Sequence, residues 1–114
     1  MYRILCFILL FLLATTSLSY AHPPSDIILE YDFETGLCSV VIMHNVENPQ
    51  AHFIKKVSIA LNGQEIISHS ISLQDEFDMQ VLGYIVPDVR KGDTLSIEAY
   101  CSISGKMKKE LKAE

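Results

Sequence analysis

The sequence of 114 residues contains no tryptophan and, beyond residue 21, no apolar run of about 18 residues that could span a bilayer. The second absence excludes a polytopic membrane protein. The sequence also lacks a glycine-rich phosphate loop, a nucleophile elbow and a Cys-x-x-Cys pair, which are common signatures of enzymes and metal cassettes. Basic residues are few: 9 Lys and Arg stand against 14 Asp and Glu, for a net charge of −5. A nucleic-acid partner is therefore not expected.

The first 21 residues have the three parts of a secretory signal peptide. A basic residue near the start precedes an apolar run at 4–14, and Ser19 and Ala21 place small residues at positions −3 and −1 of a cleavage site. An uncleaved membrane anchor is the alternative interpretation of this segment. We expect cleavage before His22 and a secreted or periplasmic domain of residues 22–114, with no stable membrane span after cleavage.

The rest of the chain consists of short apolar or alternating runs separated by turn residues, without a helical period. Asn62-Gly63 lies between two such runs and indicates a two-residue hairpin, because type I′ turns need positive φ at both central positions. The predicted strands cover residues 27–31, 37–44, 53–61, 64–72, 77–85, 94–103 and 107–111, and a frayed tail is the alternative for the last of them. Short strands at this spacing predict an all-β, immunoglobulin-like β-sandwich of seven strands in one domain, with a small barrel as the alternative.

Histidines and cysteines are the residues best suited to carry chemistry. His44 ends one predicted strand and His52 begins the next, so the loop between them could bring both imidazoles into one site. Cys101 lies on the predicted inward face of the sixth strand. Imidazole and thiolate ligands suit iron, copper or zinc rather than magnesium or calcium. His69 lies within a predicted strand of the hairpin and is interpreted as structural.

Two further interpretations compete with a site at these residues. Cys38 and Cys101 lie on the second and sixth predicted strands, about where immunoglobulin sandwiches place their inter-sheet disulfide. Such a bond would stabilise the domain by about 3–4 kcal/mol in the chain-entropy model and would remove Cys101 as a thiolate. Alternatively, cleavage before His22 would free an amine that could chelate Cu(II) together with the imidazole of the same residue.

Three segments resemble the iron-binding domain of desulfoferrodoxins and superoxide reductases. Residues 43–45 (Met-His-Asn) and 51–54 (Ala-His-Phe-Ile) are similar to the family's His-Pro-Met and Glu-His-Tyr-Ile stretches. Residues 100–105 (Tyr-Cys-Ser-Ile-Ser-Gly) are similar to its Tyr-Cys-Asn-Leu-His-Gly motif. The likeness extends from His44 to Gly105 and is greatest to short secreted members that begin His-Pro/Ala-Pro-Ser. It implies the same immunoglobulin-like fold.

The resemblance also implies a mononuclear, non-haem iron site. In superoxide reductases, four histidines and one axial cysteine hold a ferrous ion that reduces superoxide to peroxide. Carried over, His44 and His52 would be equatorial ligands and Cys101 the axial thiolate. Ser104 stands where the family has a further histidine, and His22 could replace the histidine of an upstream Glu-Lys-His-x-Pro segment, without its lysine. The resemblance thus predicts a secreted iron-binding protein with weakened superoxide reductase activity.

A second resemblance favours a different function. Residues 52–54, 62–63 and 92–93 (His-Phe-Ile, Asn-Gly and Gly-Asp) are also similar to landmarks of the Z subunit of periplasmic sulfur-oxidation carriers. That subunit has the same type of sandwich and binds a partner chain without a metal of its own. The implied alternative is a non-catalytic binding module with a disulfide between Cys38 and Cys101. Either resemblance implies a redox or carrier protein as the partner.

Overall fold

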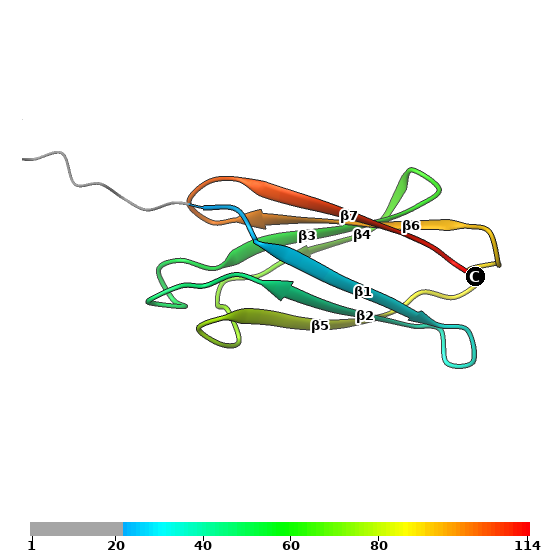
Figure 1. Ribbon diagram of the computed structural model, residues 1–114, viewed down its shortest axis with the longest axis horizontal. Helices are drawn as coiled ribbons and strands as arrows, with labels where there is room; N and C mark the ends of the chain where they lie inside the picture. Colours follow the sequence, from blue (N-terminus) through cyan, green and yellow to red (C-terminus); the bar gives the residue numbers. More distant parts are fainter. Residues whose placement is uncertain (1–21) are drawn as a thin grey trace, which may run out of the picture.

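A computed structural model describes residues 22–114, which form two antiparallel β-sheets packed face to face (Figure 1). The predicted signal peptide, residues 1–21, lies outside the described residues. The described part of the chain is all-β, and no helix in it could span a membrane. The prediction of an all-β sandwich is confirmed.

Seven strands make up the two sheets, and neighbouring strands often come from separate hairpins. The strands are β1 (Asp26–Asp32), β2 (Leu37–Met43), β3 (Ile54–Leu61), β4 (Gln64–Ser70), β5 (Met79–Ile85), β6 (Thr94–Cys101) and β7 (Lys106–Lys112). One sheet has the order β1-β2-β5 and the other β4-β3-β6-β7. Pairing of β2 with β5 and of β3 with β6 is typical of immunoglobulin-like sandwiches.

The core consists of the inward-facing residues of both sheets. In β6 the predicted alternation holds, because the buried inward residues are Leu95, Ile97, Ala99 and Cys101. The alternation stops there: the sequence predicts a strand as far as residue 103, but β6 ends at Cys101 and the Ile103 side chain is exposed. The Cys101 amide donates to the Gly105 carbonyl at 3.0 Å, which turns the chain toward β7 before residue 103 could rejoin the ladder.

The β3–β4 hairpin has the turn that the sequence predicts. Asn62 and Gly63 have φ values of 50° and 84°, and Leu61 pairs directly with Gln64 across the turn. Positive φ at both central residues is the requirement that makes Asn-Gly a hairpin signal. The local sequence therefore accounts for the turn type, and hydrogen bonds between Asn62 and both Asp93 and Thr94 hold the turn against the start of β6.

A contact between the two sheets closes the sandwich beside β4 and β5. His69 Nδ1 of β4 lies 2.8 Å from the hydroxyl of Tyr84 on β5. Burial raises the pKa of Tyr84 to about 12, so this phenol stays protonated over the physiological range. The contact agrees with the interpretation of His69 as a structural residue.

Adjacent isoleucines of β1 provide a test of the strand register. Ile27 points into the core and is 1% exposed, whereas Ile28 points outward and is 48% exposed. We predict that Ile27→Ala lowers the free energy of unfolding by about 2–5 kcal/mol, because it removes buried methyl groups and leaves a cavity. Ile28→Ala should cost about 1 kcal/mol or less. Urea unfolding of both variants measures the difference, and equal losses would contradict the register.

Candidate metal site

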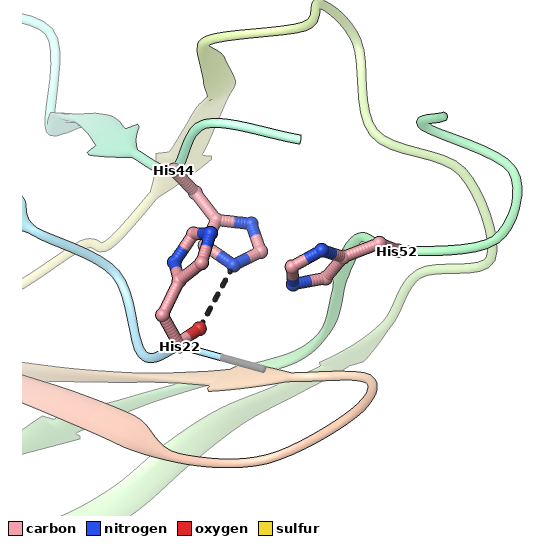
Figure 2. A group of neighbouring side chains, drawn as sticks. All are labelled: His22, His44 and His52. Atoms are coloured by element: carbon pink, nitrogen blue, oxygen red, sulfur yellow. Dashed lines mark hydrogen bonds between the residues drawn. The ribbon is translucent and has the colours of Figure 1, made fainter. Parts of the chain in front are cut away.

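Three histidines from different segments converge at the end of the sandwich where the described chain begins (Figure 2). His22 precedes β1, His44 follows β2 directly, and His52 lies in the loop before β3. One ring nitrogen of each lies within 4.8 Å of the corresponding atoms of the other two. The ring centroids are 4.7 Å apart for His44 and His52, 4.9 Å for His22 and His44, and 5.0 Å for His22 and His52.

The position of His44 follows from the two-residue period of β2. Cys38, Val40 and Ile42 point into the core, and His44 continues the same face one step beyond the strand. Its side chain is only 1% exposed. The backbone amide of His44 donates to the Asp78 carbonyl at 3.0 Å, so β2 remains joined to the segment before β5 up to this residue.

His52 is placed by a short, internally bonded loop. The Asn48 side chain accepts a hydrogen bond from the Gln50 amide at 3.0 Å, and the Asn48 carbonyl accepts from the Ala51 and His52 amides. Asparagine favours such turns because its side chain bonds its own backbone two residues further on. Phe53 then joins the end of β6, since its amide donates to Ser102 Oγ at 3.0 Å.

The cluster extends to Cys101, whose Sγ lies 3.0 Å from His52 Nε2. Cys101 is buried at the end of β6, and its backbone pairs with Ile54 at the start of β3. The four residues singled out as metal ligands in the sequence thus lie at one end of the sandwich: His22, His44, His52 and Cys101. Ser104 is exposed in the turn after β6.

The Cys38–Cys101 disulfide that the sequence left open is not formed in the structure, where both thiols are free. Cys38 lies near the start of β2, opposite Tyr31 and Tyr84, whereas Cys101 lies at the end of β6 beside His52. Their sequence positions put them on suitable strands, but the register separates them along the length of the sandwich. Burial raises the pKa of the Cys38 thiol to about 11, so it acts as a small core residue.

His22 owes its position to the segment that follows it. The Ser25 amide donates to the Met43 carbonyl at 2.8 Å, which joins this segment to the end of β2. Pro23 packs against Gly105 of the β6–β7 turn, where a β-carbon added to the glycine would lie 2.9 Å from Pro23 Cβ. The His22 ring also donates from Nδ1 to the Pro23 carbonyl at 3.1 Å, which leaves Nε2 as its free acceptor.

The electrostatic surroundings favour neutral imidazole at His52. Burial lowers the pKa of His52, and the nearby His44 and His22 lower it further. His52 therefore stays neutral at lower pH than an ordinary imidazole does. A neutral ring has a lone pair for a metal ion, so protons compete less for this position.

A cavity of about 730 Å³ lies against the cluster and has acidic rather than basic walls. Its lining residues are His22, Asn45, Val46, Glu47, Asn48, Ala51, His52, Phe77, Asp78 and Ile103. The two carboxylates have no lysine or arginine opposite them in this lining. A metal ion at the histidines would thus face a cavity whose field attracts cations and repels anions.

Gln74 contacts His44, and the sequence did not indicate this contact. Gln74 lies between β4 and β5 and places its Oε1 2.8 Å from His44 Nδ1. The two residues are 30 positions apart, and no motif or period connects them. A partner of this kind depends on how two loops meet in the fold.

Two glycines with similar backbone conformations test the anchoring of His22. Gly105 and Gly63 have φ values of 86° and 84°, but only Gly105 has a neighbour, Pro23, within 4 Å of an added β-carbon. Gly63→Ala should cost about 1–2 kcal/mol of unfolding free energy through backbone strain alone. Gly105→Ala should cost more and should displace His22, seen as a change in its NMR signals. Equal costs and unchanged His22 signals would contradict this anchoring.

The chain was compared with protein-family models, curated proteins and solved structures, and no significant match was found. The function is therefore inferred from the residues of the chain and from the geometry that brings three imidazoles together.

Proposed function

We propose that residues 22–114 form a secreted or periplasmic iron-binding domain of the desulfoferrodoxin type, with His22, His44, His52 and Cys101 as the ligands. The observation that carries this proposal is the convergence of three imidazole nitrogens within 4.8 Å. Imidazole and thiolate are borderline to soft ligands, which select iron, copper or zinc over magnesium or calcium. Ferrous iron would supply one-electron reducing chemistry at this site.

The proposed ligands differ in burial. His44 is buried and fixed by its strand, whereas His22 and His52 are partly exposed and line the cavity. Cys101 contacts His52 and would become a ligand on loss of its thiol proton. The cavity leaves one side of the ion open to small molecules.

The same surroundings support iron binding with weak superoxide reduction. Superoxide is an anion, and the cavity presents Glu47 and Asp78 without a lysine or arginine among its lining residues. Ser104 stands where the resemblance places another histidine, and a hydroxyl is a poorer ligand for ferrous iron. The protein is therefore proposed to bind iron, with superoxide reductase activity reduced or lost.

Copper is the alternative metal, and the position of His22 favours it. The imidazole of His22 belongs to the cluster, and cleavage before this residue would add its amine as a ligand. Three imidazoles and a thiolate also suit copper. This alternative changes the ion but leaves the histidine ligands the same.

A binding module without a metal is the second candidate function, favoured by the outer face of the β1-β2-β5 sheet. Ile28, Val81 and Ile85 are exposed large apolar residues on this face. Exposed apolar patches on soluble proteins mark interaction sites. The partner would be a redox or carrier protein, as in the iron-binding proposal, but the histidines would then be structural.

Single histidine substitutions distinguish these functions. We predict that residues 22–114, purified without oxygen or chelator, bind about one Fe(II) per chain. His44→Ala and His52→Ala should each weaken binding at least as much as the 10–100-fold that loss of an outer-shell partner causes, because a direct ligand is removed. His69→Ala is the matched control, since His69 contacts Tyr84 instead of the cluster. Elemental analysis and competitive titration measure the result.

The other outcomes identify the alternatives. Stoichiometric copper that depends on His22 and His44 would replace iron by copper at the same ligands. A folded protein that takes up no transition metal would contradict the metal-binding proposal and favour the binding module. Equal metal binding by the His44, His52 and His69 variants would also contradict the proposed ligands.

A further inference from the structure

Gln74 is a buried glutamine that makes two of its three side-chain hydrogen bonds with His44. Its side chain is 1% exposed. Its Nε2 donates to the His44 carbonyl at 2.8 Å and to the Glu76 carbonyl at 2.9 Å. Its Oε1 lies 2.8 Å from His44 Nδ1. No polar atom of this amide is left without a partner.

These contacts fix which way the Gln74 amide points. Carbonyl oxygens accept hydrogen bonds and cannot donate them, so the group that faces the His44 and Glu76 carbonyls must be the NH₂. A rotated amide would place Oε1 against two other acceptors inside the protein, where unsatisfied polar groups are costly. Oε1 therefore faces His44, and it can only accept.

The tautomer of His44 follows from this orientation. Because Oε1 accepts, His44 Nδ1 must carry the hydrogen that is donated to Gln74. In the neutral ring the lone pair then belongs to Nε2. Nε2 lies 3.3 Å from the His22 carbonyl oxygen, which also can only accept (Figure 2). A neutral ring has one hydrogen, and the shorter, fully buried contact with Gln74 at 2.8 Å takes it, which leaves Nε2 opposite a second acceptor. A metal ion at Nε2 would relieve this repulsion.

Gln74 also connects the two segments that carry histidines of the cluster. Its backbone amide donates to the Pro49 carbonyl at 3.2 Å, in the loop that leads to His52. Its side chain holds both the ring and the backbone carbonyl of His44. One buried residue thus restrains the orientation of the His44 ring and the loop beside it.

We infer that Gln74 is a positioning residue that holds His44 as the Nδ1–H tautomer and turns its Nε2 toward the metal ion. This inference rests on the proposed metal-binding function, but the tautomer is a property of the metal-free protein. Hydrogen bonds from the outer nitrogen of a ligand histidine fix its orientation and raise its basicity, and their loss costs about 10–100-fold in metal affinity.

Two matched substitutions test the role of Gln74. Gln74→Met removes all three side-chain bonds at similar volume. Gln80→Met is the control, because Gln80 is also buried, at 3% exposed, and bonds the Asp75 amide and the Val81 carbonyl but not a histidine. The first readout is the imidazole ¹⁵N shifts of metal-free protein at about pH 8.5, two units above the ordinary histidine pKa of about 6.5. His44→Ala identifies the His44 signals.

The wild-type protein and Gln80→Met should show His44 protonated at Nδ1. In Gln74→Met the hydrogen should move to Nε2, where it can be donated to the His22 carbonyl. Fe(II) affinity should fall about 10–100-fold in Gln74→Met and remain unchanged in Gln80→Met. A wild-type His44 protonated at Nε2, or a Gln74→Met variant with the wild-type tautomer and affinity, would overturn the inference.

Two further arms keep the result interpretable. If Gln74→Met does not fold, the tautomer of the wild-type protein still decides: His44 protonated at Nδ1 supports the inference, and His44 protonated at Nε2 overturns it. If the wild-type protein has the Nδ1–H tautomer and yet takes up no metal ion, the proposed function fails while the effect of Gln74 on His44 stands. The two failures are therefore distinguishable.

Discussion

The two-residue period of strands packed into one core is the constraint on which the site depends. In β2 it takes the chain from Cys38 through the core to His44, and in β6 it ends at Cys101. A shift of one residue would expose the apolar set of either strand, so burial strongly specifies the register. The same packing that stabilises the sandwich therefore holds His44 and Cys101 at its end.

Strands and turns are largely predictable because their signals are local. Alternation in β6 and the Asn62-Gly63 turn depend on neighbouring residues, and both appear as the sequence indicates. The ends of strands are harder to predict from the sequence. The predicted fifth strand includes Phe77, whereas β5 begins at Met79. The bend at that end depends on contacts with other loops, such as the Val46 amide bonded to the Phe77 carbonyl.

The candidate site is partly predictable for the same reason. His44 and His52 flank one short loop, so their spacing indicates proximity, whereas the inclusion of His22 depends on Pro23 packing against Gly105. The Cys38–Cys101 disulfide is not formed in the structure. Strand order suggests this pair, but strand order does not say how far along its strand each cysteine lies. The sequence does not indicate the contact between Gln74 and His44, because buried polar contacts between loops depend on the whole fold.

X-ray absorption at the metal edge tests the central claim most directly. Residues 22–114 loaded with one equivalent of Fe(II) should show a first shell with imidazole nitrogens, their outer ring atoms, and one sulfur. The imidazole contribution should fall in His44→Ala and the sulfur should disappear in Cys101→Ser. A first shell of oxygen atoms alone, unchanged in either variant, would contradict a metal site built from the three histidines and Cys101.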